Sequence, residues 1–394
     1  MKSINPLSDI NVSRILRLVW KKKGISRVEI ANTLNLDKST VTKIVSSLTD
    51  VGIVKEIAEG STGPQGGRKP IYLEISKSFA CVGGIEINPE RFVCCLINLQ
   101  GEILFQYQEN FSPEIFAALQ IEGVFQKAYN LILKESQKLG IKMICVGLGF
   151  PALVNSDKGL IESSVPLMIN ENYPIVESLK KYTNLPILIE NDARCCCSGE
   201  LMNQTEDFVN NSVFVLAEYR LEQPKSKSQK NLSIGLGLVM DGKILKGPEF
   251  SAGEFRSILW EPGTTGQFLS KEDNLTYQNN DSNPMESVFS ELAMHIAFLI
   301  NILNLQCVFI GGIEEKYIEN LKKVIKDRIL VQWPYSEKKN FLIRSASFKS
   351  LAVAYGAAAL CVDNLFYLPK LDDFTKINYS ILDYIFNTES QDKL

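Results

Sequence analysis

Histidine is nearly absent from this 394-residue sequence, and long hydrophobic runs are missing altogether. His295 is the single histidine, and with no second imidazole nearby we expect it to be a packing residue of the apolar helix 288–303 rather than a ligand or a base. No segment approaches the roughly 18 consecutive apolar residues of a membrane-spanning helix. The first ten residues lack the apolar core of a secretion signal. We therefore expect a cytoplasmic protein with no membrane partner.

Disulfides are also not expected. The number of cysteines, nine, is odd, and most of them lie in apolar segments. Both features favour reduced thiols in the core. The run Cys195, Cys196, Cys197 raises the alternative of a metal site. Three consecutive residues on a helix point in different directions and cannot all face one ion. The sequence therefore predicts no metal site at these cysteines.

Length and charge divide the chain into a basic head and an acidic body. A chain of 394 residues is expected to form two or three domains. Residues 1–70 contain 12 basic residues (Lys and Arg) and six acidic ones (Asp and Glu). The remaining residues contain 30 basic and 39 acidic residues. A positive head on a negative body is the distribution expected when only the head approaches nucleic acid.

The first 75 residues show three short helical patterns and then two strands. An apolar stripe in 9–22 ends at Gly24. Ser26 and Glu29 have the spacing of a capping box at the start of a second helix. Asp37 is placed to cap a third helix, whose apolar residues recur at i, i+3, i+4 and i+7 (Val41, Ile44, Val45, Leu48). Strands at 52–57 and 71–75 flank a glycine-rich hairpin, so the order is that of a winged helix.

The outer face of the third helix and the glycine-rich hairpin are the candidate DNA-binding surface. Hydroxyls and lysines on an exposed helix suit the major groove, and an arginine in a glycine-rich wing suits a minor groove or a phosphate. An ordinary solvated helix face and a flexible linker remain the alternatives. The candidate residues are Ser26, Arg27, Lys38, Ser39, Thr40, Thr42, Lys43, Ser46, Gly67, Arg68 and Lys69.

The rest of the chain alternates strands and helices. A hairpin pattern covers 79–106, a helical pattern 116–139 and a buried strand 143–149. A later strand ends at Asn191 and Asp192, and a glycine-punctuated strand covers 234–239. Such alternation predicts a mixed α/β layer fold.

Several of these segments together resemble the ROK family (repressor, open reading frame, kinase), and its xylose-repressor branch most of all. The head matches at 26–31 (SRVEIA), 36–41 (LDKSTV) and 66–70 (GGRKP), and the body at 186–200 (PILIENDARCCCSGE) and 241–254 (DGKILKGPEFSAGE). The resemblance implies an N-terminal winged helix-turn-helix followed by a two-lobed, actin-like domain of the sugar kinase, Hsp70 and actin superfamily. We place the winged helix at 1–75, the first lobe at 76–192 and the second lobe at 193–369, and leave open a return of 370–394 to the first lobe.

The resemblance also implies a sugar site. Asn191 and Asp192 match the family's catalytic Asn-Asp pair, with Asp192 as the base candidate, and Glu254 ends its sugar-contacting Ala-Gly-Glu. By their chemistry, Asn191, Asp192 and Glu254 can each hydrogen-bond to sugar hydroxyls. Ser257 stands where the family has a sugar-contacting histidine, and a shorter hydroxyl changes the reach of that position. Asn191 and Asp192 also fit the start of the following helix as caps, and the two roles are compatible.

Two departures from the family pattern argue against kinase chemistry. Active members begin their first hairpin with an aspartate, a glycine pair and a threonine that wrap phosphate, whereas this chain has Glu86, Asn88, Pro89 and Glu90. Proline donates no N–H, and the extra carboxylates repel a triphosphate. The loop after Glu254 has no cysteine or histidine for the family's zinc. We therefore expect no nucleotide cofactor, no metal and no enzyme activity, with Asp192 as a vestigial base.

These observations predict a DNA-binding repressor of carbohydrate-metabolism genes with a sugar effector. Its partners would be a double-stranded operator, the sugar and further copies of itself, as a homodimer or a dimer of dimers on a palindromic site. One alternative is an active carbohydrate kinase that uses ATP and carries a DNA-binding head. Another is a regulator that has lost its ligand and responds to a protein partner.

Overall fold

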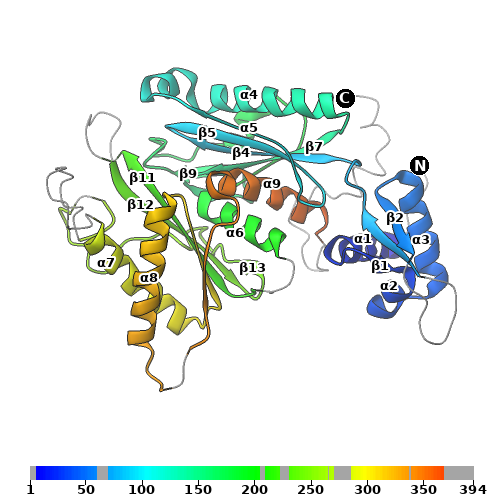
Figure 1. Cartoon of the computed structure of the whole chain (residues 1–394). Helices are drawn as coiled ribbons and strands as arrows, with labels where there is room; N and C mark the ends of the chain where they lie inside the picture. Colours follow the sequence, from blue (N-terminus) through cyan, green and yellow to red (C-terminus); the bar gives the residue numbers. More distant parts are fainter. Residues whose placement is uncertain are drawn as a thin grey trace.

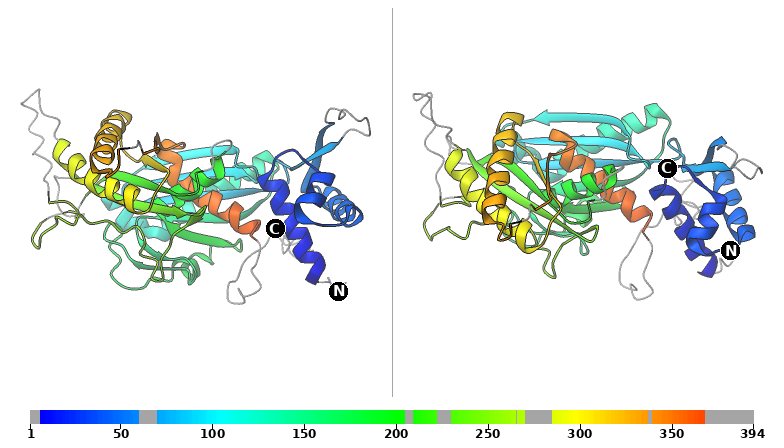
Figure 2. Two further views of the ribbon diagram at one scale, coloured as in Figure 1. Left: turned by 90° about the horizontal axis from the view of Figure 1, so that it is seen from below. Right: turned by 60° about the horizontal axis from the view of Figure 1, so that its bottom comes forward.

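The structure, a computed structural model, has a small head at one end of a larger body built on two sheets (Figure 1, Figure 2). It describes residues 6–59, 70–204, 209–221, 230–264, 266–269, 285–336 and 339–367. The tip of the expected wing, including Gly67, Arg68 and Lys69, lies outside these residues. In the described part of the chain, no helix is both long enough and apolar enough to cross a membrane.

The head is a three-helix unit with a three-stranded sheet. Ser26 and Glu29 form the expected capping box, and Gly24 and Gly52 adopt positive φ at the ends of two elements, where a side chain would be strained. Asp37 is the N-cap residue of the third helix but makes no side-chain cap hydrogen bond. The strand order is β1-β3-β2, and the elements are α1 (Pro6–Lys21), β1 (Ile25–Ser26), α2 (Arg27–Leu34), α3 (Lys38–Val51), β2 (Val54–Glu59) and β3 (Ile71–Ile75).

The first sheet of the body has the order β10-β7-β4-β5-β6. Strands β4 and β7 are buried along their whole length because helices cover both faces of the sheet. The expected 79–106 hairpin is confirmed as the antiparallel pair β4–β5. The elements are β4 (Cys81–Asn88), β5 (Arg91–Asn98), β6 (Ile103–Asn110), α4 (Pro113–Leu139), β7 (Met143–Phe150), β8 (Leu153–Asn155), β9 (Leu160–Ser163), α5 (Ile175–Leu179) and β10 (Ile187–Asn191).

The second sheet has the order β13-β12-β11-β14-β15. The long antiparallel pair β11–β12 lies in its middle, and two further helices pack together on it. The elements are β11 (Ser212–Leu221), β12 (Lys230–Met240), β13 (Lys243–Ile244), α7 (Glu286–Ile302), β14 (Cys307–Gly311), α8 (Glu315–Gln332), β15 (Leu342–Ser345) and the short 3-10 helix η1 (Lys349–Leu351).

Two helices, α6 (Asp192–Asn203) and α9 (Ala352–Leu365), lie between the two sheets (Figure 1). They approach so closely that a Cβ added at Gly356 would lie 1.8 Å from the Cys195 carbonyl oxygen. The nine cysteines are all buried and unpaired, as expected. Because α6 begins at Asp192, this packing fixes the position of the candidate sugar site.

The head packs against the body through α1. Trp20 Nε1 donates to the Leu99 carbonyl at 3.0 Å, and the Trp20 ring stacks on Phe366 with centroids 5.1 Å apart. Arg17 donates to the Phe366 carbonyl at 2.9 Å and lies 3.7 Å from Asp363. Phe366 directly follows α9, so one helix packs against α6 along its length and reaches the head at its end.

Candidate functional site

Helix α3 buries one face and exposes the other. Val41, Val45 and Leu48 are at most 2% exposed and fix the helix on the head's core. The predicted DNA-contacting residues on the opposite side are exposed, except Thr40, which is half-buried; they are Lys38, Ser39, Thr40, Thr42, Lys43 and Ser46. Thr42 also donates to the Lys38 carbonyl one turn earlier, at 2.7 Å. The face offers hydroxyls and two cations, the side-chain types that bind base edges and phosphates.

The two predicted residues at the start of α2 are held within the head. Ser26 is 4% exposed, and its hydroxyl accepts the Glu29 N–H of the capping box. Arg27 pairs with Glu56 of β2 at 2.8 Å. The hydroxyl of Ser26 is thus used in capping, and we do not keep Ser26 as a DNA contact.

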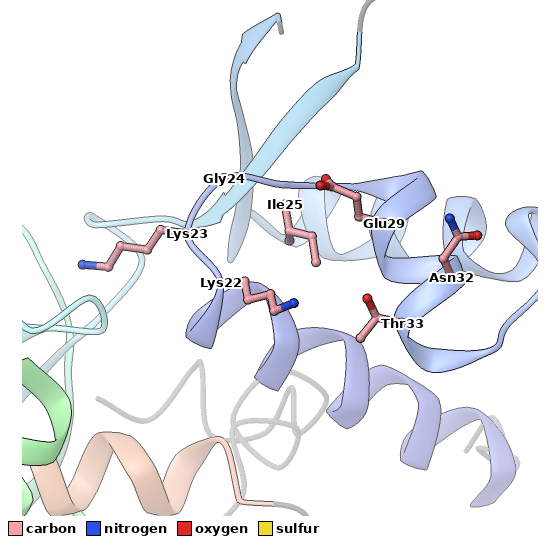
Figure 3. A pocket seen from close by; sticks show the side chains of 7 residues that line it. All are labelled: Lys22, Lys23, Gly24, Ile25, Glu29, Asn32 and Thr33. Atoms are coloured by element: carbon pink, nitrogen blue, oxygen red, sulfur yellow. The ribbon is translucent and has the colours of Figure 1, made fainter. Parts of the chain in front are cut away.

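A polar groove of about 340 Å³ lies between α1 and α2 (Figure 3). Lys22, Asn32 and Thr33 lie along it, whereas the Lys23 side chain points away from α2. Its lining contains no residue of α3. The groove therefore shares no lining residue with the candidate DNA-binding surface.

Asn191 and Asp192 lie where β10 meets α6. The Asn191 side chain accepts the Arg194 N–H and donates to the Ala152 carbonyl, each at 3.2 Å, so the predicted capping role is confirmed. Asp192 is 4% exposed and accepts the Ala193 N–H at 2.8 Å. Both side chains are therefore held in one orientation by the main chain around them.

The structure brings Glu254 to the same place through β12. Gly235 forms an isolated antiparallel bridge with Glu254, and a Cβ added at Gly235 would lie 3.6 Å from Asp192 Oδ1. Glu254 is exposed. Ser257 is 4% exposed, and its hydroxyl accepts the Leu259 N–H at 3.1 Å. The bridge thus brings the main chain at Glu254 close to Asp192, and Ser257 supports the loop that follows Glu254.

A buried ion pair lies next to this point, and the sequence analysis did not find it. Arg194 Nε donates to Glu190 at 2.8 Å, and both side chains are 1% exposed. Arg194 also donates to the carbonyls of Phe250 and Ala252, and Lys246 lies 3.0 Å from the other Glu190 oxygen. The network fixes the segment that leads to Glu254. Glu190 and Arg194 both stand in the 186–200 motif, but nothing in that motif marks them as a buried pair.

The β4–β5 hairpin is linked to the second sheet by an arginine. Arg91 donates to Glu86 of β4 at 2.7 Å and to Glu218 of β11 at 2.6 Å. The two carboxylate side chains are 3% and 6% exposed. The sequence analysis noted Glu86 but missed Arg91 and Glu218 as its partners. The chain's own ion bridge therefore joins this hairpin to the opposite sheet.

The Arg91 bridge predicts a pH effect on stability. Burial raises the pKa of Glu86 from 4.5 to about 7, because the buried carboxylate loses its hydration. The Arg91 guanidinium offsets this loss only in part, since it is shared with Glu218. A folded pKa above the unfolded value gives stability that is fully present below the unfolded pKa and lost as the pH rises through the folded one. We expect the melting temperature to fall as the pH rises from about 4.5 to about 7, measured by circular dichroism. Glu86→Gln should remove this part of the fall, and an unchanged profile would contradict the assignment.

In the described residues, no cluster of three or more His, Cys, Asp and Glu side chains is arranged to hold a metal ion. Two clusters of buried polar side chains in the described part of the body lie near the predicted site residues, one at Asp192 and one at Arg91. The first contains Asn191, Asp192 and the neighbouring Glu190–Arg194 pair, and the second is occupied by protein charges.

Two family profiles match the chain. The winged helix-turn-helix DNA-binding profile covers residues 8–55, and the ROK family profile covers 82–265. Similar solved structures include a ROK family transcriptional regulator described as a homologue of the E. coli MLC protein, with a TM-score of 0.68 and 20% identity over 90% of this chain and 96% of that one. Another is a ROK family glucokinase from Streptomyces griseus in complex with glucose and AMPPNP. It has a TM-score of 0.55 and 16% identity, over 71% of this chain and 99% of that one. The expected winged helix and two-lobed, actin-like fold are confirmed.

Curated relatives are similar over most of their length. The xylose repressor of Caldicellulosiruptor bescii is 23% identical over 92% of this chain and 98% of its own. The xylose repressor of Bacillus subtilis is 22% identical over 90% and 95%. The DNA-binding transcriptional dual regulator NagC of Escherichia coli is 22% identical over 66% and 60%.

Proposed function

We propose that this ROK family transcriptional regulator, a winged helix-turn-helix joined to a ROK domain, represses genes of carbohydrate metabolism and responds to a sugar. One observation carries the proposal. The head presents the exposed face of α3, and it packs through Trp20 on the end of α9, the helix that also packs on α6 of the sugar site. A sugar that binds one arrangement of the body better than another therefore has a physical route to the head.

On the DNA side, we propose that α3 lies in the major groove of the operator. Lys38 and Lys43 would neutralise phosphates, and the hydroxyls would reach base edges. The wing residues Gly67, Arg68 and Lys69 would bind the adjacent backbone or minor groove. A homodimer or a dimer of dimers in the cytoplasm would match a palindromic operator.

On the effector side, we propose that Asn191, Asp192 and Glu254 hydrogen-bond to sugar hydroxyls, with Ser257 shaping the loop beside them. The names of the relatives favour a pentose such as xylose. We further propose that kinase activity is lost, because catalysis needs the nucleotide phosphates held as well as a base present. The β4–β5 hairpin would have to hold these phosphates, and in this chain it carries the ion bridge in which Arg91 joins Glu86 to Glu218.

A melting screen against a panel of sugars, with and without operator DNA, tests the effector. We expect one sugar at about 100 times its Kd to raise the melting temperature by about 5 °C and to release the DNA. Asp192→Ala should abolish the shift and leave DNA binding intact. The readouts are differential scanning fluorimetry and fluorescence anisotropy of a labelled duplex selected by the wild-type protein.

Two outcomes would redirect the proposal. ATP-dependent phosphorylation of a sugar that Asp192→Asn abolishes would establish the kinase alternative. No thermal shift with any sugar, together with intact DNA binding, would favour the regulator that responds to a protein partner.

A further inference from the structure

The loop that follows Glu254 is held by side-chain hydrogen bonds from its neighbours. Gln267 accepts the Ile234 N–H at 2.6 Å and donates to the carbonyls of Ile234 and Phe255 at 2.9 Å. Glu291, on α7 and 3% exposed, accepts the Leu269 N–H at 3.0 Å. The loop is therefore tied both to β12 and to α7.

His295, the chain's single histidine, makes the link closest to Glu254 on the α7 side. Its Nε2 lies 3.0 Å from the Ile258 N–H and 3.5 Å from the Ser257 hydroxyl. Its Nδ1 lies 2.8 Å from the Glu291 carbonyl oxygen. A carbonyl only accepts and a main-chain N–H only donates, so Nδ1 carries the hydrogen and Nε2 the lone pair. The ring is therefore neutral, and it also meets Phe255 edge-on at 5.4 Å.

We infer that His295 is a positioning residue, which holds Glu254 in place for the sugar effector. This inference rests on the proposed role of Glu254 in the sugar site. The Gly253 carbonyl accepts the Leu236 N–H of β12 at 3.1 Å, just before Glu254. His295 holds Ile258, four residues after it. Glu254 is thus fixed between two anchors, and a group that is already ordered loses less entropy when it binds a ligand. The sequence analysis expected only packing from His295, because nothing local to α7 marks its partners.

His295→Phe tests the inference, because it keeps a flat ring of similar size and removes both nitrogens. We expect hydrogen exchange at the Ile258 amide to accelerate about tenfold, and the affinity for the sugar to fall about tenfold, the effect of losing one hydrogen bond. Operator binding without sugar should not change. Ile302→Ala, at an exposed position at the end of the same helix, is the control and should change none of these values.

Nitrogen NMR adds a readout that a packing role would not produce. With one histidine in the chain, a long-range proton–nitrogen spectrum contains one imidazole from the protein. We expect a protonated Nδ1 and an unprotonated Nε2. His295→Gln, whose side-chain oxygen can still accept an N–H, should recover part of the sugar affinity lost in His295→Phe.

The outcomes separate this inference from the proposed function. A wild-type protein that binds sugar no more tightly than His295→Phe, or an Nε2 that carries hydrogen, would overturn the positioning role alone. A wild-type protein that binds no sugar, although its Ile258 amide is protected, would overturn the effector proposal and the positioning role with it.

Discussion

Lys43→Glu is expected to weaken operator binding by about a hundredfold while leaving the fold and the sugar response intact. Lys43 is exposed on α3, opposite the buried Val41 and Val45. In a dimer the change removes two cation–phosphate contacts and adds two repulsive charges. Each protomer's change should lower the operator affinity by about tenfold. Fluorescence anisotropy over a range of salt concentrations is the measurement, and the slope of log affinity against log salt should become shallower.

Lys326→Glu is the matched control, because it makes the same charge change on an exposed position of α8. It should leave operator affinity within about twofold, since charges beyond a Debye length are screened. Equal affinities for Lys43→Glu and the wild type, at low and at physiological salt, would remove α3 from the DNA interface.

Arg91→Met is expected to destabilise the body by about 3–5 kcal/mol, because it removes the cation that two buried carboxylates share. Glu86 and Glu218 come from different sheets, so the loss should also loosen one sheet against the other. Urea unfolding of the body, followed by circular dichroism, measures the change in the free energy of unfolding. The loss should be smaller at pH 5 than at pH 8, because a proton on Glu86 then replaces part of the missing charge.

Two variants separate the bridge from a simple loss of packing. The triple change Arg91→Met, Glu86→Gln, Glu218→Gln removes all three charges and should recover most of the stability lost in Arg91→Met. Lys138→Met breaks a surface pair with Glu135, in which the lysine side chain is 57% exposed, and should cost less than about 1 kcal/mol. A triple variant no more stable than Arg91→Met would show that the ion bridge is not the source of the effect.

Local sequence signals predicted the elements of the head well. The Ser26–Glu29 spacing predicted the start of α2, and the 3.6-residue recurrence of apolar positions predicted α3 and its exposed face. Both signals act within one or two turns of helix, so they need no information from distant segments. They could not show that the Ser26 hydroxyl is consumed by its own cap, because burial depends on the strands that pack around it.

For the candidate site, the motifs predicted its residues and missed the contacts that hold the segments around them. Asn191, Asp192 and Glu254 were found as parts of two motifs, and the bridge between Gly235 and Glu254 joins those motifs in space. Arg194 stands inside the 186–200 motif, which does not mark its partners, and His295 stands in no motif. Both side chains bond to main-chain groups far along the chain, near Ala252 and at Ile258, and no local pattern in the sequence marks such contacts.

The sequence by itself determined the order of elements, the charged head, the series of family motifs and the lack of cysteine or histidine in the loop after Glu254, since each depends only on residue type and spacing. The tertiary structure alone decided that Arg91 pairs with Glu218, 127 positions away, and that the single histidine anchors that loop. The physical reason is that an ion pair or a hydrogen bond depends on a few ångströms of separation in space. Separation along the chain does not fix that distance until both sheets and the helices between them have packed.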